Sequence, residues 1–161
     1  MSENIQRVFL DTSFFIRLFK TDDPDHTNAK IYFTRFRDQN AMLFLSTIVA
    51  AEYGIKGNID KLPFRFLQVV PFNISHAQKT ALLARNAFEK RQKGILQLEK
   101  RVVIPNDTKI LAQAEEVGTD LFIARDDNCE KVYRSMKEDG LITFSYLDLR
   151  TPPSTFFSEL F

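Results

Sequence analysis

The chain has 161 residues, which is enough for one domain with a substantial hydrophobic core. Hydrophobic residues make up 44% of it and include 16 Phe but no Trp, so we expect a core packed mainly with Phe side chains. The formal net charge is +1, which excludes a general electrostatic attraction to nucleic acid and leaves only a local basic patch as a source of one.

Two further features concern the cellular compartment. The single cysteine, Cys129, excludes an internal disulfide framework and indicates a reducing compartment. Residues 1–6 lack the pattern of a signal peptide, and no apolar run approaches the roughly 20 residues that span a bilayer. We therefore expect a cytoplasmic protein without a membrane segment.

Short apolar runs alternate along the chain with longer stretches of helical periodicity. Strands are predicted at residues 8–10, 42–45, 68–71, 120–124 and 142–144. Helices are predicted to begin at a Thr12 or Ser13 cap, at 23–25, at 46–47, near Asn58, at a Ser75 cap, at 105–107 and at 126–128. Residues 89–103 are charged and contain Gly94, and they suggest a helix extension followed by a loop.

This alternation predicts an α/β protein with three layers, α/β/α, around a central and mostly parallel sheet of about five strands. Residues 1–150 would form the domain, and residues 151–161 an apolar tail. The tail contains Phe156, Phe157, Leu160 and Phe161, so we expect it to pack on the domain or at a subunit interface.

Four acidic residues occur in similar local settings. Asp11 and Asp126 follow predicted strands, Glu52 lies among small and apolar residues after the second strand, and Asp107 lies in the first turn of a predicted helix. Each has a simpler interpretation as a helix cap or a partly exposed side chain. The carboxyl ends of parallel strands share one edge of a sheet, however, so we expect the four to converge there.

Converging carboxylates repel one another and raise each other's pKa unless a cation is present, which points to a divalent metal. An all-oxygen site favours Mg²⁺ or Mn²⁺, whereas His26, His76 and Cys129 match no zinc motif. Such a site suits hydrolysis of phosphodiester bonds. Thr12 and Ser13 are interpreted either as residues that position a water or a phosphate oxygen, or as simple helix caps.

The ordered set of segments resembles the PIN-domain family. The resemblance rests on residues 8–13, on Glu52 after a Ser-Thr pair, on residues 104–112 and on residues 121–127. It implies a parallel-sheet fold and a Mg²⁺- or Mn²⁺-dependent endoribonuclease whose metal-binding catalytic acids are Asp11, Glu52, Asp107 and Asp126, with Ser13 as an auxiliary hydroxyl. It also implies similarity to VapC-type toxins of type II toxin–antitoxin pairs, which act on RNA, often form homodimers and are blocked by an antitoxin.

The last segment departs from the family pattern. The family often has another acid two residues after the fourth, where this chain has Asn128, and a hydroxyl residue where it has Ala124. Asp127 is adjacent, but we expect its side chain to point elsewhere. These departures affect the second metal position and leave the four-acid set intact.

A locally basic stretch precedes the Asp107 segment. Its cations are Lys90, Arg91, Lys93, Lys100 and Arg101. They are candidates for phosphate contacts with RNA, and the alternative is a solvated helix face.

Three other functions compete with the nuclease. A PIN-like fold that binds RNA or protein with little or no cleavage stays open because of the imperfect last segment. A phosphotransferase of haloacid-dehalogenase type, with Asp11 as nucleophile, requires an Asp where Ser13 stands. A receiver domain requires a different order of acids along the chain.

Overall fold

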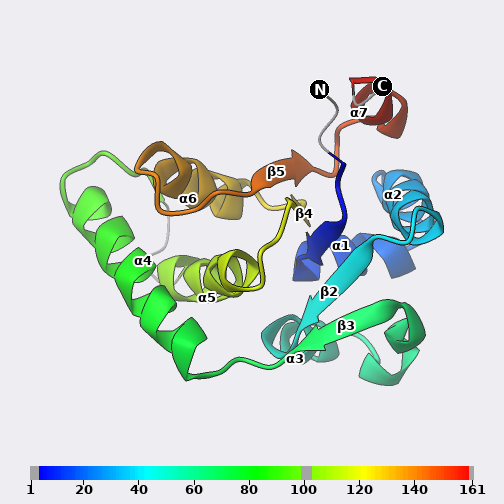
Figure 1. Cartoon of the computed structure of the whole chain (residues 1–161), viewed down its shortest axis with the longest axis horizontal. Coiled ribbons are helices and arrows are strands. Elements are labelled where there is room, and N and C mark those ends of the chain that lie inside the picture. The colour runs from blue at the N-terminus through cyan, green and yellow to red at the C-terminus, as the bar shows by residue number, and fades with distance from the viewer. Residues whose placement is uncertain (1–3, 99–102, 160–161) are drawn as a thin grey trace.

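The structure is a computed structural model, and it describes residues 4–98 and 103–159. Its centre is a sheet of five strands in the order β3-β2-β1-β4-β5, and every neighbouring pair is parallel (Figure 1). The strands are β1 (Arg7–Leu10), β2 (Met42–Ser46), β3 (Leu67–Val70), β4 (Leu121–Ala124) and β5 (Ser145–Asp148). The predicted fold class, with a parallel sheet of five strands between helices, is confirmed.

Helices connect the strands and cover both faces of the sheet. They are α1 (Thr12–Phe19), α2 (His26–Asp38), α3 (Thr47–Gly54), α4 (Ile74–Gln92), α5 (Val103–Glu116), α6 (Asp127–Glu138) and α7 (Pro153–Glu159), with two short 3₁₀ turns at Ile59–Lys61 and Phe64–Phe66. Helices α1 and α2 lie on one side of the sheet and α5 and α6 on the other, while α4 packs against α5 (Figure 1). Parallel strands require such crossover connections.

The central strands are buried on both faces, which explains their continuous apolar sequences. Every residue of β4 is buried, and so are Val8, Phe9 and Leu10 of β1. Phe9 stacks on Phe122 of β4 with ring centroids 5.7 Å apart. The Phe-rich core expected from composition is therefore built across the sheet itself.

Two sequence-based boundaries were wrong. The last strand is β5, Ser145–Asp148, and not residues 142–144, although Ile142 and Phe144 are both buried. These two side chains belong to the segment between α6 and β5 and are buried in the core. The apolar sequence of this segment therefore resembles that of a buried strand. Helix α5 begins at Val103 and not at 105–107, which places Asp107 in its second turn.

The predicted caps of two helices were also wrong. The N-cap of α1 is Asp11, whose carboxylate accepts a hydrogen bond from the Ser13 amide, and not Thr12 or Ser13. The N-cap of α4 is Asn73 instead of Ser75, and Asn73 forms a reciprocal capping box with His76. Asx residues compete well with hydroxyl residues for this position, and composition alone does not rank them.

The last helix lies against α2. The ring centroids of Phe157 and Phe36 are 5.4 Å apart, and those of Phe156 and Tyr32 are 5.8 Å apart. Arg35 places its guanidinium 4.4 Å from the centroid of the Phe157 ring. Leu160 and Phe161, also named as apolar tail residues, lie outside the described residues.

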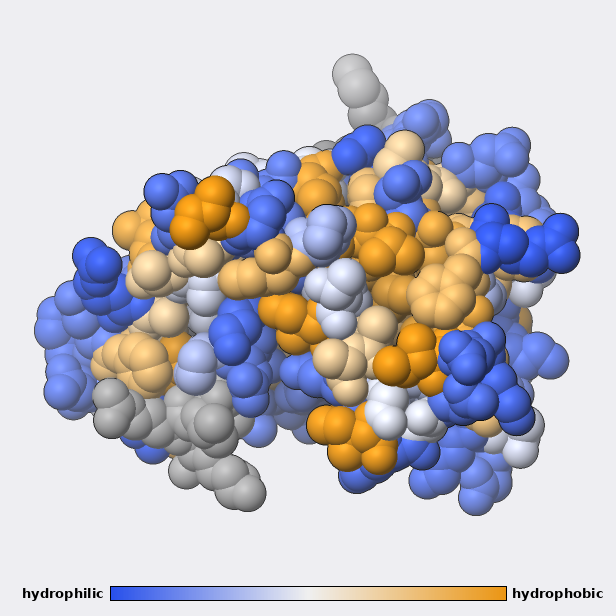
Figure 2. Space-filling model, turned by 90° about the horizontal axis from the view of Figure 1, so that it is seen from below, coloured by the Kyte–Doolittle hydropathy of each residue, from blue (hydrophilic) through white to orange (hydrophobic). Residues whose placement is uncertain are grey.

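Part of the hydrophobic content stays on the surface. Figure 2 shows a face on which hydrophobic side chains gather towards the middle, between hydrophilic margins. Ile55 and Ile74 are among the most exposed large hydrophobic residues, at 80% and 77%. Among the described residues, no helix has both the length and the apolar character needed to cross a membrane.

Candidate functional site

The candidate site lies where β1 and β4 end. From β1 the sheet extends through β2 and β3 in one direction and through β4 and β5 in the other. The order in which strands are added therefore reverses between β1 and β4. Open α/β sheets bind ligands in the crevice at such a reversal. Asp11 follows β1 directly, and Asp126 follows β4 after one intervening residue.

Asp11 is 6% exposed and is held by its neighbour two residues on. Its Oδ2 accepts hydrogen bonds from the Ser13 hydroxyl at 2.5 Å and from the Ser13 amide at 3.1 Å. Burial raises the pKa of Asp11 to about 6, the Ser13 hydrogen bonds partly oppose this, and the nearby Asp126 and Glu52 carboxylates add to it. Asp11 therefore has a fixed orientation in a site that disfavours its charge.

The Ser13 hydroxyl has a second partner. Its oxygen accepts a hydrogen bond of 2.7 Å from the backbone amide of Arg125, just after β4. The hydroxyl donates to Asp11 and accepts from Arg125, so it joins the ends of the two strands that frame the site. Ser13 is therefore a positioning residue for the Asp11 carboxylate.

Glu52 reaches the site from α3, whose N-cap is Ser46 at the end of β2. Its Oε2 accepts a hydrogen bond from the Thr12 hydroxyl at the start of α1. Thr12 thus orients Glu52 in the same way that Ser13 orients Asp11. The two hydroxyl residues named from the sequence each hold a different carboxylate.

Asp107 has the most perturbed carboxylate of the site. Its Oδ2 is buried and has no hydrogen-bond partner among the described residues. Burial, together with the smaller effect of the charges of Asp126, Asp11 and Glu52, raises the pKa of Asp107 to about 8. A buried acceptor without a donor is rare in folded proteins and calls for an explanation.

Asp126 is the N-cap of α6. Its Oδ1 accepts hydrogen bonds from the amides of Asn128 at 2.9 Å and Cys129 at 3.0 Å, so both capping hydrogen bonds fall on one carboxylate oxygen. The capping interpretation of Asp126 is therefore correct, and it does not exclude a second role. Asn128, the residue that departs from the family pattern, lies in the first turn of the same helix.

These residues line one cavity of about 440 Å³. Its wall contains Asp11, Thr12, Ser13, Glu52, Asp107, Asp126 and Asn128. Sequence reasoning missed three other lining residues, Ile16, Asn106 and Ile110, although Asn106 is the immediate neighbour of Asp107. Arg17 and Arg125 also line the cavity, but each lies close to an acid outside the set of four. The Arg17 Nε atom is 3.7 Å from an Asp23 carboxylate oxygen, and the Arg125 Nε atom is 2.9 Å from an Asp25 carboxylate oxygen.

The donor set of this cavity fits a divalent metal ion. Within residues 4–98 and 103–159, no Lys, Arg or His side chain forms an ion pair with Asp11, Glu52, Asp107 or Asp126. A bound cation would give the Asp107 oxygen, which has no hydrogen-bond partner among the described residues, a positive partner. It would also lower the raised pKa values of Asp107 and Asp11. Carboxylate oxygens are the ligands of Mg²⁺ and Mn²⁺, and Mg²⁺ in particular keeps several waters that bridge to acids not bound directly.

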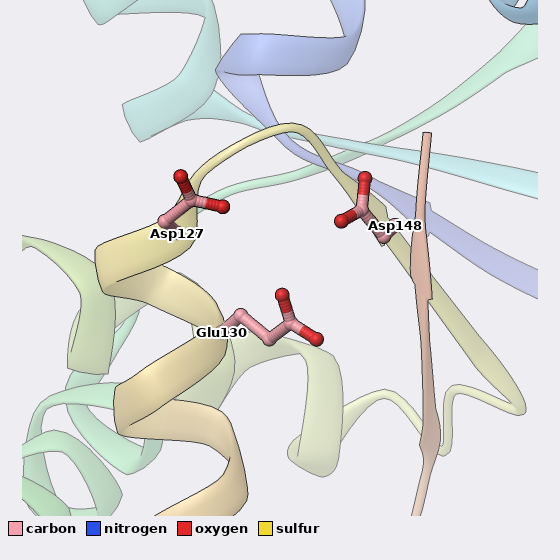
Figure 3. A group of neighbouring side chains, drawn as sticks. All are labelled: Asp127, Glu130 and Asp148. Atoms are coloured by element: carbon pink, nitrogen blue, oxygen red, sulfur yellow. The ribbon is translucent and has the colours of Figure 1, made fainter. Parts of the chain in front are cut away.

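A tighter acidic group lies outside this cavity. Asp127 and Glu130 of α6 and Asp148 of β5 point towards a common space, and their ligand oxygens lie within 4.8 Å of one another (Figure 3). Arg150 forms ion pairs with two of them. Its Nη2 atom lies 2.7 Å from an Asp127 carboxylate oxygen and 2.5 Å from an Asp148 carboxylate oxygen. Asp127, considered as a substitute for the missing fifth acid, thus faces Arg150 on the surface and does not line the cavity.

The basic stretch has mixed surroundings. Lys90 pairs with Asp139 at 2.6 Å and donates to the Ser135 hydroxyl, so its charge is already engaged within the fold. Arg91 lines a separate cavity at the end of α4, and Lys93 is exposed. Lys100 and Arg101 lie outside the described residues. RNA binding by this stretch stays a prediction.

Solved structures with the same fold include bacterial VapC proteins. VapBC2 from Rickettsia felis, solved with a DNA fragment from its promoter, has 16% identity and a TM-score of 0.56, covering 88% of this chain and 98% of that one. VapC20 of Mycobacterium tuberculosis, described as a toxin that cleaves the sarcin-ricin loop, has 18% identity and a TM-score of 0.52, covering 76% and 92%. DNA-bound VapBC from Salmonella typhimurium has 18% identity and a TM-score of 0.52, covering 90% and 99%.

The sequence itself supports the same grouping. No curated protein matches the chain. The model of the PIN domain family, in contrast, matches residues 8–135, a span that runs from β1 into α6 and contains all four cavity acids. This match covers most of the chain, and the chain therefore belongs to the PIN domain family.

Proposed function

We propose that this protein is a metal-dependent endoribonuclease and the toxin of a type II toxin–antitoxin pair. The observation that carries the proposal is the cavity at the ends of β1 and β4, lined by Asp11, Glu52, Asp107 and Asp126, in which one Asp107 oxygen is buried without a partner among the residues that the structure describes. These four acids are the proposed catalytic and metal-binding residues, and Mg²⁺ or Mn²⁺ is the proposed cofactor.

A bound divalent ion supplies a lowered pKa for an attacking water and stabilisation of charge on the phosphate oxygens. The residues of the chain prepare the site for this chemistry. Ser13 fixes the Asp11 carboxylate and Thr12 fixes Glu52, so both acids are oriented before substrate arrives. Asp126 is held by two backbone amides at the start of α6. Asn128 has a neutral amide at a position where the family often has an acid. The site therefore has one negative charge fewer, which favours direct binding of fewer metal ions.

The partners follow from the same assignment. The substrate is RNA, and the cognate partner is an antitoxin protein that blocks the site. Two of the similar structures are VapBC complexes, and VapC20 is described as a toxin that cleaves the sarcin-ricin loop, which supports both parts of the proposal. We further propose that the protein forms a homodimer. We also propose that it acts in the cytoplasm, in agreement with its single cysteine, which is buried and free.

Cleavage assays test this proposal. Protein purified free of any antitoxin is incubated with a panel of single-stranded and structured RNAs in Mg²⁺, in Mn²⁺ and in EDTA. We expect endonucleolytic cleavage only with the metals, and a loss of at least about hundredfold in rate for Asp11→Asn and for Asp107→Asn. The matched control is Asp60→Asn, since Asp60 is an exposed acid in a 3₁₀ turn away from the cavity.

The alternative is a PIN-fold module that binds RNA or protein and cleaves weakly or not at all. The observation in its favour is that Asn128 lines the cavity while Asp127 pairs with Arg150. RNA binding without metal-stimulated cleavage across the whole panel would support this alternative and exclude the nuclease. Equal rates for Asp107→Asn and Asp60→Asn would exclude the proposed role of the four acids.

A further inference from the structure

A second cavity adjoins the acidic one and has a different character. Its volume is about 560 Å³, and it lies between α1 and α3, lined mainly by Ile16, Arg17, Phe19, Lys20, Tyr53 and Lys56. Ile16 and Arg17 line both cavities, so the two share one wall. We call this second cavity the α1–α3 groove.

Each wall of the α1–α3 groove consists of a helix end and the residues that follow it. Ile16 and Phe19 lie in the last turn of α1 and Lys20 is the C-cap of that helix, while Tyr53 lies at the end of α3 and Lys56 and Gly57 lie just beyond that helix. Each wall thus offers an aromatic ring and a lysine. The same helices carry Thr12, at the start of α1, and Glu52, next to Tyr53 in α3, and both of these residues line the acidic cavity.

The groove contains two aromatic rings, of which that of Tyr53 is buried and that of Phe19 is exposed. Tyr53 is 8% exposed and packs so closely on Gly57 that a Cβ there would lie 2.6 Å from the Tyr53 Cζ. Phe19 rests on Tyr53 with ring centroids 5.9 Å apart, yet it is 40% exposed. Phe19 thus has a supported ring with an accessible surface, which is what a base-stacking platform requires.

The lysines of the groove are available for a ligand. Lys20 and Lys56 are both exposed, and neither forms an ion pair with an acidic side chain of the described residues. An anionic and partly aromatic ligand matches this combination of two free cations and a ring. The groove shares two lining residues with a cavity proposed to act on a phosphodiester bond, so the ligand that suits it is the RNA chain on either side of that bond.

We propose that the α1–α3 groove binds the single-stranded RNA that flanks the scissile phosphate, with one base stacked on Phe19 and backbone phosphates beside Lys20 and Lys56. This subsite rests on the proposed ribonuclease function. It selects unpaired RNA, because a base inside a duplex has no free face for Phe19. It reads little sequence, because every base has a face that stacks.

Binding in the absence of divalent metal tests the subsite separately from catalysis. The probe is a fluorescein-labelled single-stranded RNA decamer of mixed sequence, followed by anisotropy in EDTA with the full chain. Phe19→Ala is expected to weaken binding by roughly tenfold, and Phe19→Trp to restore it. The matched control is Phe64→Ala, since Phe64 is 41% exposed but lies in a 3₁₀ turn outside the groove.

Salt dependence tests the lysines. The double change of Lys20 and Lys56 to Ala is expected to reduce the slope of log affinity against log salt by about 1.4, at about 0.7 for each phosphate contact with a single strand. The same double change at Lys30 and Lys131, two exposed lysines on other helices, is expected to have little effect. A duplex of the same length should bind weakly and respond little to Phe19→Ala.

The outcomes separate the two proposals. Affinity that is equal for Phe19→Ala and Phe64→Ala, or wild-type protein that binds no single-stranded RNA, overturns the subsite. Cleavage by wild-type protein together with unchanged binding by Phe19→Ala overturns the subsite and keeps the nuclease. Weakened binding by Phe19→Ala without any metal-dependent cleavage keeps the subsite and overturns the nuclease.

Discussion

At the scale of single residues, Ser13 shows how one hydroxyl organises the site. It donates to Asp11 and accepts from the Arg125 amide, so it is fully used within the fold. The hydroxyl lowers the pKa of Asp11, although burial still raises that pKa to about 6. Ser13 therefore favours the charged form of the acid that we propose as a metal ligand.

Ser13→Ala is expected to destabilise the protein by about 1–3 kcal/mol, because it leaves a buried Asp11 oxygen and the Arg125 amide each short of one partner. It should also shift the metal dependence of cleavage to higher pH, since the pKa of Asp11 rises further without the hydroxyl. Chemical denaturation and pH–rate profiles measure the two effects. Ser154→Ala, at an exposed position of α7, is the control, and a Ser13→Ala profile identical to it contradicts the positioning role.

The sequence allowed the four acids to be named because each follows or lies near a strand end, and parallel strands end at one edge. It did not reveal how the acids are held. That Thr12 binds Glu52, 40 residues away, depends on how α1 packs against α3. The pairing of Asp127 with Arg150 and of Lys90 with Asp139 likewise joins residues far apart in sequence, and no local pattern predicts either.

At the scale of elements, apolar runs predicted the buried strands well and their boundaries less well. β4 was placed almost correctly because all four of its residues are buried between helices. The strand expected at 142–144 failed because Ile142 and Phe144 are buried in a connection. Hydrophobicity reports burial, and only backbone pairing, here between β4 and β5, distinguishes a strand from a buried loop.

Helix α7 tests whether the apolar tail belongs to the fold of one chain. Phe157 is 5% exposed and contacts Phe36 and the Arg35 guanidinium on α2. Phe157→Ala is expected to lower the free energy of unfolding by about 3 kcal/mol, whereas Phe64→Ala should have a much smaller effect. Denaturation at two protein concentrations distinguishes packing within the chain from packing at a subunit interface. A loss that depends on protein concentration, or none at all, would contradict packing within one chain.

At the scale of the whole molecule, charge is nearly balanced overall and unbalanced at one place. The net charge is +1, yet the acidic cavity gathers four carboxylates without a cationic partner among the described residues. A fold accepts this arrangement at a cost to its stability, which is typical of a site built for a ligand. The same imbalance makes the stability of the metal-free protein depend on pH in a defined direction.

The metal-free protein is expected to lose stability as pH rises from about 5 to about 8. The pKa of Asp107 rises from 3.8 to about 8 and that of Asp11 from 3.8 to about 6, chiefly through burial. In this range the folded state therefore binds more protons than the unfolded state, so the free energy of unfolding falls with pH, by an amount on the order of 3 kcal/mol. Asp139 and Asp148 act in the opposite direction but below this range. The hydrogen bond from Lys90 lowers the pKa of Asp139, and for Asp148 burial raises the pKa but is outweighed by the hydrogen bonds and charge of Arg150.

Thermal unfolding in EDTA at pH 5, 6.5 and 8 measures this dependence, with an expected fall in Tm of about 5–10 °C across the series. Asp107→Asn should flatten the series and raise the Tm at pH 8, because it removes the most disfavoured charge. Mg²⁺ or Mn²⁺ should restore the stability of the wild type most strongly at pH 8, where protons no longer compete for the carboxylates, and should do little for Asp107→Asn. A Tm that rises with pH in EDTA, or equal stabilisation of both proteins by metal, would be incompatible with a cavity of four mutually repelling acids that is completed by a cation.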